Sequence, residues 1–167
     1  MIKINYQHLS IIAALCLTAT LASCNAMAVS VDNFKVRNIR PNMLAPLRSS
    51  FDLNYDLLVE SKNDIPVPIP VDGFNVGVYV EGERAADSKL PPGVTTVKVG
   101  KPITLSNRIV LGSQQNLAQK IPLIANKGRW SIKIDGNMNL QGYSLPVNYK
   151  TDIANPIKKG GSLIPGF

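Results

Sequence analysis

Histidine and cysteine, the side chains most often used in catalytic and metal sites, are nearly absent from this sequence of 167 residues. The one histidine is His8, and the two cysteines are Cys16 and Cys24. A chain cut before Cys24 cannot contain a Ser-His-Asp triad, a Cys-His pair or a zinc site with histidine ligands. We therefore expect no enzyme activity, no bound metal and no cofactor.

Long hydrophobic runs are also missing. The apolar stretch Leu9–Leu21 is shorter than the roughly 20 residues that a membrane-spanning helix needs, but it has the length of the apolar part of a secretory signal peptide. It ends in Leu21-Ala22-Ser23-Cys24, which resembles a bacterial lipobox, the site where a signal peptidase cuts before a cysteine that carries lipid. This pattern predicts a signal peptide over 1–23, acylation of Cys24 and a short tether over 24–28.

A second cleavage site competes with the lipobox. Ala26-Met27-Ala28 fits the pattern of ordinary signal peptidase, which would release a protein that begins at Val29. We favour lipidation because each residue before Cys24 fits the lipobox, and because an unpaired thiol is a liability in an oxidising compartment. Asn25 replaces the aspartate that in some bacteria retains lipoproteins in the inner membrane. In an organism with two membranes, the expected location is therefore the outer membrane, facing the periplasm.

Charge of one sign is mildly in excess. Lys and Arg number 18 against 11 Asp and Glu, a net charge of +7, and removal of Lys3 with the signal peptide leaves +6. The basic residues are scattered and aromatic residues make up 6% of the chain, whereas nucleic-acid-binding proteins group basic side chains and interleave stacking aromatics. We expect no nucleic-acid partner. The positive field suits solubility and contact with anionic lipid or another anionic polymer of the envelope.

Apolar and polar residues alternate along most of the remaining chain, which is typical of strands with one buried face. The predicted strands cover 29–36, 51–60, 74–80, 84–88, 94–99, 103–111, 130–140 and 143–153. We expect an irregularity at Asp32-Asn33, and an edge position or bulge for the strand that contains Pro146. About seven strands with regular turns predict an all-β fold, an antiparallel fibronectin- or immunoglobulin-like β-sandwich. The domain would span 29–157, before a tail over 158–167. We interpret this tail as flexible, with a hydrophobic terminus that docks on a partner as the alternative.

Two segments depart from the alternation. Leu117, Ile121 and Ile124 have helical spacing, with Ser113 as the expected N-cap and Pro122 limiting the helix to two turns. Ile65–Val71 alternates proline with aliphatic residues. It is interpreted as a rigid crossover between sheets, with an exposed apolar docking segment as the alternative.

Few residues remain that suggest chemistry. Glu81 and Glu83 flank Gly82 at a predicted hairpin tip, where charged residues are usually solvated. Asp52–Asp56 resembles the start of a calcium loop, but that loop requires Gly at its sixth position and Glu at its twelfth, where this chain has Leu57 and Asn63. We therefore expect an exposed acidic ladder there. Trp130 alternates with aliphatic residues and is predicted to be core; the alternative is a residue that stacks on sugars.

The stretch Leu53–Pro156 resembles the water-stress and hypersensitive-response (WHy) domain of the type-2 late-embryogenesis-abundant (LEA) proteins. The matching features, in order, are a polar turn with prolines, a glycine turn, a strand rich in Val and Thr, and a Trp-containing strand that ends in glycine. They are Ser61–Pro68, Tyr79–Glu83, Pro92–Val97 and Trp130–Gly136. Asn63 is followed by Asp64 where the family has Asn-Pro. The resemblance implies a fibronectin-like sandwich with a binding or stress-protective role, including in desiccation stress, and no catalytic residues.

These observations predict a membrane-anchored envelope lipoprotein with a non-catalytic β-sandwich that binds a partner or protects against stress. The alternative is a docking or assembly subunit of an envelope or secretion complex that associates by strand addition. A third hypothesis, a hydrolase of envelope polymers, requires a deep cleft with two neighbouring carboxylates.

Overall fold

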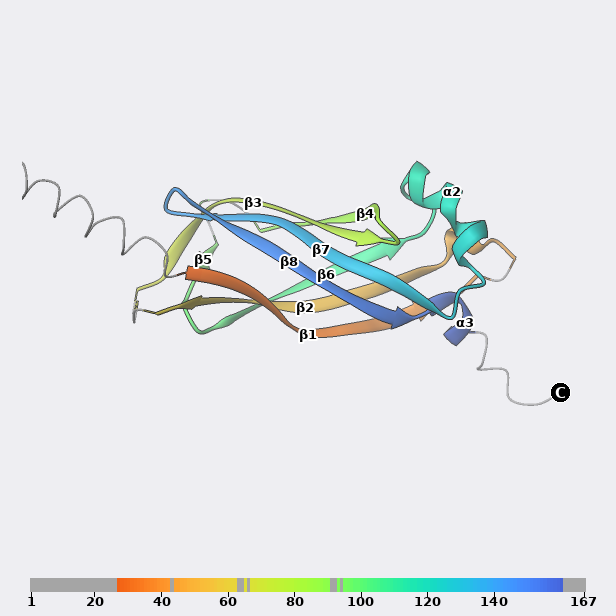
Figure 1. Ribbon diagram of the computed structural model, residues 1–167, viewed down its shortest axis with the longest axis horizontal. Coiled ribbons are helices and arrows are strands. Elements are labelled where there is room, and N and C mark those ends of the chain that lie inside the picture. Colours follow the sequence, from red (N-terminus) through yellow and green to blue (C-terminus); the bar gives the residue numbers. More distant parts are fainter. Residues whose placement is uncertain are drawn as a thin grey trace, which may run out of the picture.

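The computed structural model describes residues 27–42, 44–62, 65, 67–90, 93 and 95–160. These residues form an antiparallel β-sandwich with eight strands in two sheets and a short helix at one end, which confirms the predicted fold class (Figure 1). In chain order the strands and helices are β1 (Met27–Arg40), η1 (Pro46–Arg48), β2 (Ser50–Ser61), β3 (Ile69–Val80), β4 (Glu83–Ser88), β5 (Thr96–Val97), β6 (Pro102–Val110), α2 (Gln115–Ile124), β7 (Arg129–Leu140), β8 (Tyr143–Ala154) and α3 (Pro156–Gly160).

The smaller sheet has the strand order β1-β2-β6, and the larger sheet has the order β4-β3-β7-β8 with β5 beside the start of β3. Every strand pair is antiparallel. The chain passes from the smaller sheet to the larger one between β2 and β3. This connection contains most of Ile65–Val71, the proline-rich segment that we interpreted as a crossover. The end of that segment, Ile69–Val71, already belongs to β3, with Ile69 and Val71 buried.

The core follows the alternation in the sequence. Phe51, Leu53, Tyr55, Leu57 and Val59 are the inward residues of β2, and each is at most 1% exposed. The facing strand β7 supplies a second inward row, which begins with Trp130 at 0% exposure and confirms that this residue is core. Because complete burial of a large aliphatic side chain contributes about 1.5–3 kcal/mol, this core stabilises the fold without a disulfide.

Two local predictions are confirmed. The register of β1 against β2 shifts between Asp32 and Lys35, and Asn33 adopts a left-handed backbone with φ of 50°. Asparagine tolerates that conformation better than most residues do, which explains the bulge. Pro146 in β8 lies opposite Asn137 in β7, and β8 is an edge strand of its sheet.

Two predicted boundaries are wrong. Of the strand expected over 94–99, the described residues form only the two-residue strand β5, because only Ile69 and Pro70 of β3 pair with it. The helix expected to stop within two turns at Pro122 runs for ten residues and contains that proline.

Helix α2 continues through Pro122 because tertiary packing outweighs the backbone hydrogen bond that proline cannot make. Leu117, Ile121 and Ile124 are at most 3% exposed and hold the helix against the sandwich. The N-cap prediction is also wrong. Gln114 occupies the cap position, and the Ser113 hydroxyl donates instead to the Val110 carbonyl, 2.7 Å away.

The ends of the domain differ slightly from the predicted boundaries. Strand β1 begins at Met27, inside the expected tether 24–28, and α3 reaches into the expected tail 158–167. The predicted signal peptide 1–23, Cys24 and residues 161–167 lie outside the described residues.

Candidate functional site

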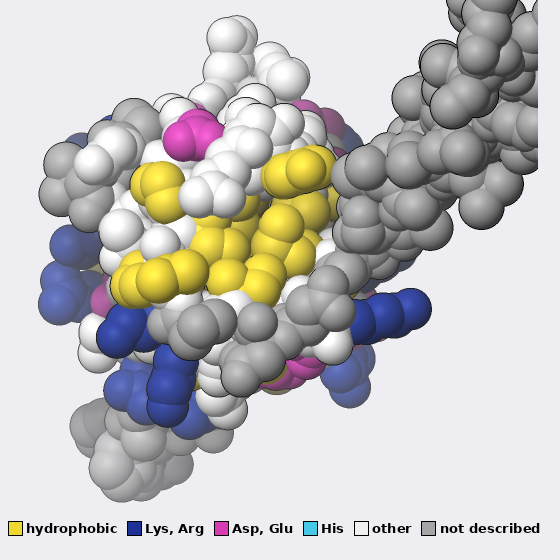
Figure 2. All heavy atoms as spheres, turned by 90° about the vertical axis from the view of Figure 1, so that its left-hand side faces the viewer, with side chains coloured by type: hydrophobic (Ala, Val, Ile, Leu, Met, Phe, Trp, Pro, Cys, Tyr) yellow, Lys and Arg dark blue, Asp and Glu magenta, His cyan; other side chains and the backbone are white. Residues whose placement is uncertain are grey.

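Apolar side chains gather at the end of the sandwich where β1 begins (Figure 2). Two of them are largely exposed, Val67 at 65% and Tyr143 at 47%. The others are half-buried against the core: Met27, Val29, Ile65, Val99 and Ile103. The register places the starts of β1 and β6 beside the end of β2, because Met27 lies opposite Ser61 and Pro102 lies opposite Leu58. We call this surface, made of the seven named residues, the apolar end.

Basic side chains lie beside the apolar end (Figure 2). Lys62 follows β2, and Lys98 and Lys101 flank the turn between β5 and β6; all three are exposed. Two exposed carboxylates, Glu60 and Asp72, lie in the same part of the fold, and Asp72 accepts a hydrogen bond of 3.0 Å from the Gly142 backbone.

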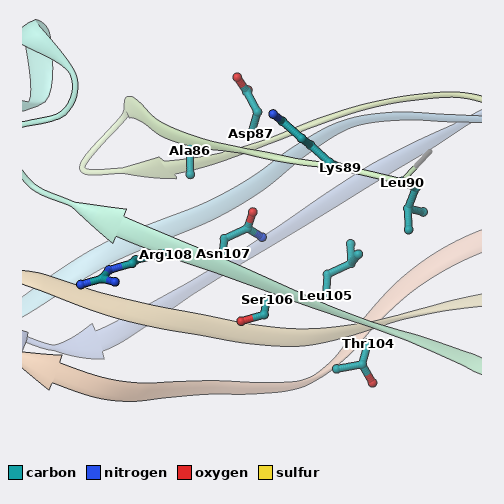
Figure 3. A pocket seen from close by; sticks show the side chains of 9 residues that line it. All are labelled: Ala86, Asp87, Lys89, Leu90, Thr104, Leu105, Ser106, Asn107 and Arg108. Atoms are coloured by element: carbon teal, nitrogen blue, oxygen red, sulfur yellow. The ribbon is translucent and has the colours of Figure 1, made fainter. Parts of the chain in front are cut away.

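A groove runs between β4 and β6 along one side of the sandwich, with a volume of about 470 Å³ (Figure 3). It is lined by Ala86, Asp87, Lys89, Leu90, Thr104, Leu105, Ser106, Asn107 and Arg108. Within the described chain, β4 pairs only with β3, and β6 only with β2. Each strand therefore presents one unpaired backbone edge toward the groove, and unpaired edges accept added strands.

A buried polar bridge connects three strands beside this groove. The Asn107 side-chain amide donates to the Ser88 hydroxyl at 3.0 Å and to the Tyr55 hydroxyl at 3.3 Å, and the two hydroxyls are hydrogen-bonded to each other. Burial raises the pKa of Tyr55 above 10.0, and the hydrogen bonds with Ser88 and Asn107 only partly oppose it. The phenol is therefore held neutral, and the bridge joins β2, β4 and β6 as structure. The signal for it in the sequence was polar residues at inward positions of alternating strands.

The opposite side of the sandwich carries a second groove, between β1 and β8, of about 370 Å³. Phe34 and Tyr149 meet across it with their ring centroids 5.6 Å apart. This aromatic contact connects the two sheets where the strands do not pair.

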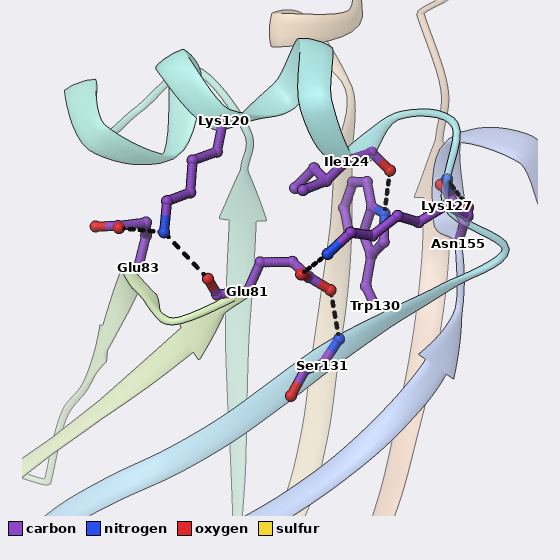
Figure 4. A network of polar contacts seen from close by, with 8 residues as sticks. All are labelled: Glu81, Glu83, Lys120, Ile124, Lys127, Trp130, Ser131 and Asn155. Carbon is purple, nitrogen blue, oxygen red and sulfur yellow. Dashed lines mark hydrogen bonds and ion pairs between the residues drawn. The ribbon is translucent and has the colours of Figure 1, made fainter.

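The far end of the sandwich is closed by polar contacts beneath α2 (Figure 4). One Glu81 carboxylate oxygen accepts from the Ser131 backbone N–H at 2.9 Å, and the other pairs with Lys127. Lys120 on α2 pairs with Glu83 at 2.6 Å. The expectation that Glu81 and Glu83 are simply solvated is wrong, because their side chains are only 13% and 23% exposed.

Opposing effects set the pKa of Glu81. Burial acts to raise it, but the hydrogen bonds from Lys127 and Ser131 and the charges of Lys127 and Lys120 together outweigh burial, so that the pKa is lowered from 4.5. A carboxylate held ionised in this way is a poor general acid. Its function here is to fasten the β3–β4 hairpin to β7 and to Lys127 in the connection between α2 and β7.

Two further side chains complete this closure. The Trp130 indole N–H donates to the Ile124 carbonyl at 2.9 Å, and the Asn155 amide donates to the carbonyls of Ala125 and Lys127 at 2.8 Å each. We call this region, made of α2, the β3–β4 hairpin, Trp130 and Asn155, the capped end.

The predicted acidic ladder lies on the outer face of the smaller sheet. Asp52 accepts from Asn38 at 2.7 Å, and Asp56 accepts from Thr104 at 2.6 Å and Asn33 at 2.8 Å. The hydrogen bonds from Thr104 and Asn33 lower the pKa of Asp56. Each aspartate is thus engaged by a neighbouring strand. Among the described residues, no three His, Cys, Asp or Glu side chains are close enough together to hold a metal ion.

The described helices are all too short or too polar to cross a membrane. No protein-family model matches the chain, and no curated protein matches it. The solved structure of a protein from Archaeoglobus fulgidus is similar to this chain with a TM-score of 0.42 and 16% sequence identity. The similarity covers 74% of this chain and 94% of the archaeal one.

Proposed function

We propose that this protein is a bacterial envelope lipoprotein, held in the membrane by acylated Cys24, whose β-sandwich is a non-catalytic binding module of the LEA type-2 kind. The observation that carries the binding role is the groove between β4 and β6, which has a free strand edge on each side. The anchor rests on the lipobox-like sequence before Cys24.

The use that the fold makes of its reactive side chains supports a non-catalytic role. Glu81 and Glu83 fasten the capped end, and Tyr55 is buried in a bridge between strands. A hydrolase of envelope polymers needs two carboxylates free to exchange protons in a cleft. The carboxylate of Glu81 is instead held ionised by its partners.

The same groove favours a docking subunit as the second candidate function. An extended segment laid along β4 or β6 gains backbone hydrogen bonds that do not depend on its sequence, and the pockets between side chains select among segments. Leu90 and Leu105 offer apolar contacts there, and Asp87, Lys89 and Arg108 offer charged ones (Figure 3).

The anchor is tested by intact mass spectrometry of the protein extracted from its native membranes. We expect an N-terminal Cys24 with added acyl mass, and we expect Cys24→Ser to move the protein into the aqueous fraction. An unmodified N-terminus at Val29 would contradict the lipoprotein assignment.

The binding role is tested by placing a photoreactive amino acid at Lys89 or Arg108 in the groove, with Lys133 on the outer face of β7 as the matched control. We expect cross-links from the two groove positions and none from the control. One stable, stoichiometric product would favour the docking subunit. Absence of a product, together with poor survival of a deletion strain on drying, would favour stress protection.

A further inference from the structure

We propose that the apolar end rests on the membrane surface, with its apolar side chains among the headgroups of anionic phospholipid. This inference rests on the proposed function, because the lipid on Cys24 brings that end to the bilayer. It goes beyond anchoring, because it fixes which end of the sandwich faces the lipid.

The first argument is the position of the tether. Met27 is the first residue of β1 and lies at the apolar end, three residues after Cys24. An extended chain spans at most about 3.3–3.6 Å per residue, so Met27 lies within about 10 Å of the lipidated cysteine. The capped end lies at the opposite end of the long axis and is therefore held away from the bilayer (Figure 1).

The second argument is the exposure of the apolar end. Val67 and Tyr143 project with 65% and 47% of their surface accessible, and half-buried aliphatic side chains extend the apolar area toward the core. Contiguous apolar surface of this kind marks contact with another phase or partner. Tyrosine is also enriched at membrane interfaces, where its ring is buried and its hydroxyl reaches water.

The third argument is charge. Lys62, Lys98 and Lys101 are exposed and lie next in sequence to residues of the apolar end or to their strand partners. Of the two neighbouring carboxylates, Asp72 is engaged by the Gly142 backbone. A lysine attracts anionic headgroups within about a Debye length, so the contact should weaken as salt is added.

Vesicle flotation tests this contact independently of acylation. The probe is the chain from residue 24 with Cys24→Ser, mixed with vesicles of phosphatidylglycerol and phosphatidylethanolamine. We expect it to float with these vesicles, and to float less with vesicles of phosphatidylcholine alone or at high salt. The double variant Val67→Asp with Tyr143→Asp should lower the bound fraction about ten-fold, since interfacial binding scales with buried apolar area.

The matched control carries the same charge change at the other end. Leu44 and Leu123 are 100% and 75% exposed near η1 and on α2, so Leu44→Asp with Leu123→Asp should leave flotation unchanged. Far-ultraviolet circular dichroism and urea unfolding establish that each variant is folded. A second variant, Lys62→Gln with Lys98→Gln and Lys101→Gln, should remove most of the salt dependence.

Failure to float, or an equal loss in both aspartate variants, would overturn the proposal. So would a protein partner that is lost only with the Val67 and Tyr143 substitutions while vesicles are ignored, because the apolar end would then be a protein interface. An N-terminus at Val29 combined with normal flotation would remove the anchor but leave this surface. If Cys24 is acylated in the native protein but the unacylated chain does not float, the anchor stands and the proposed lipid contact of the apolar end is refuted.

Discussion

The two ends of the sandwich differ in how the hydrophobic core is covered. At the capped end, α2 covers the core. The Trp130 indole and the Glu81 carboxylate beneath it both have hydrogen-bond partners. At the apolar end, aliphatic side chains and a tyrosine reach solvent, and no helix within the described part of the chain covers them. Among the described residues, one end of the core is therefore covered by a helix, and the other end keeps apolar side chains exposed.

The exposed side chains of the apolar end are unfavourable in water and therefore need an explanation. Exposed apolar surface contributes nothing to folding, and it promotes association in water. The capped end shows that this fold can cover its core with ten residues of helix. We therefore interpret the uncovered end as a contact surface.

The largest expected effect is at the capped end. Trp130→Ala should lower the free energy of unfolding by about 3–5 kcal/mol, because it empties a fully buried site and removes the bond to the Ile124 carbonyl. Urea denaturation of the Cys24→Ser chain measures it. The neighbouring control Leu123→Ala, at an exposed position, should change stability by less than about 0.5 kcal/mol. Equal effects would show that α2 does not seal this end.

The buried polar bridge of Tyr55, Ser88 and Asn107 should give the second-largest effect on the free energy of unfolding. Tyr55→Phe should cost about 1–2 kcal/mol at neutral pH, since Ser88 and Asn107 lose a buried partner. The pKa of Tyr55 is raised above 10.0 in the folded protein, so its stabilisation is complete below pH 10 and is lost as pH rises through the higher folded value. The variant should therefore lose less stability than the parent protein above pH 10. Tyr143→Phe, at the exposed apolar end, is the control, and identical alkaline profiles for all three proteins would refute the bridge.

A smaller effect should come from the Glu81 carboxylate, which fastens the β3–β4 hairpin to Lys127 and β7. Glu81→Gln should cost roughly 1 kcal/mol, an estimate kept low because Lys127 is 51% exposed and its charge is screened. The pKa of Glu81 is lowered from 4.5, so the stabilisation is present above pH 4.5 and is lost as pH falls through the folded value. The difference between variant and parent in urea titrations should therefore vanish in acid. Glu60→Gln, which removes an exposed carboxylate at the other end, is the control substitution.

The smallest effects on stability are expected from substitutions of exposed apolar residues, and these substitutions distinguish the two ends by lipid binding. Val67→Ser and Leu123→Ser replace exposed apolar residues at opposite ends, and each should shift the unfolding free energy by less than about 0.5 kcal/mol. Thermal unfolding followed by circular dichroism measures both. Only Val67→Ser should weaken vesicle flotation, and a large loss of stability from it would mean that Val67 is part of the core.

The strands could be predicted from the sequence because the signal for them is local. The alternation in β2 and β7 is a property of neighbouring residues, and the edge position of β8 follows from the missing N–H of Pro146. The length of α2 could not be predicted in the same way. Pro122 is a local signal to stop, and it was outweighed by burial of Ile124 against distant strands.

The features of the candidate site were harder to predict for the same reason. Glu81 finds Lys127 and Ser131 some fifty residues along the chain, so its neighbours in sequence gave no sign that it is engaged. The Tyr55, Ser88 and Asn107 bridge also joins three separate strands. The apolar end is assembled from the starts of β1 and β6, two connections and a hairpin, and only one of these, Ile65–Val71, was apolar enough in the sequence to suggest a docking segment.

The orientation of the sandwich on the membrane is measured most directly by spin labels in the acylated protein reconstituted into vesicles. With Cys16 removed and Cys24 in a thioether, Tyr143→Cys and Leu123→Cys each provide a single labelling site, one at each end. We expect the label at 143 to be relaxed mainly by oxygen dissolved in the lipid and the label at 123 mainly by a water-soluble nickel chelate. Equal access of both labels to the chelate would contradict it.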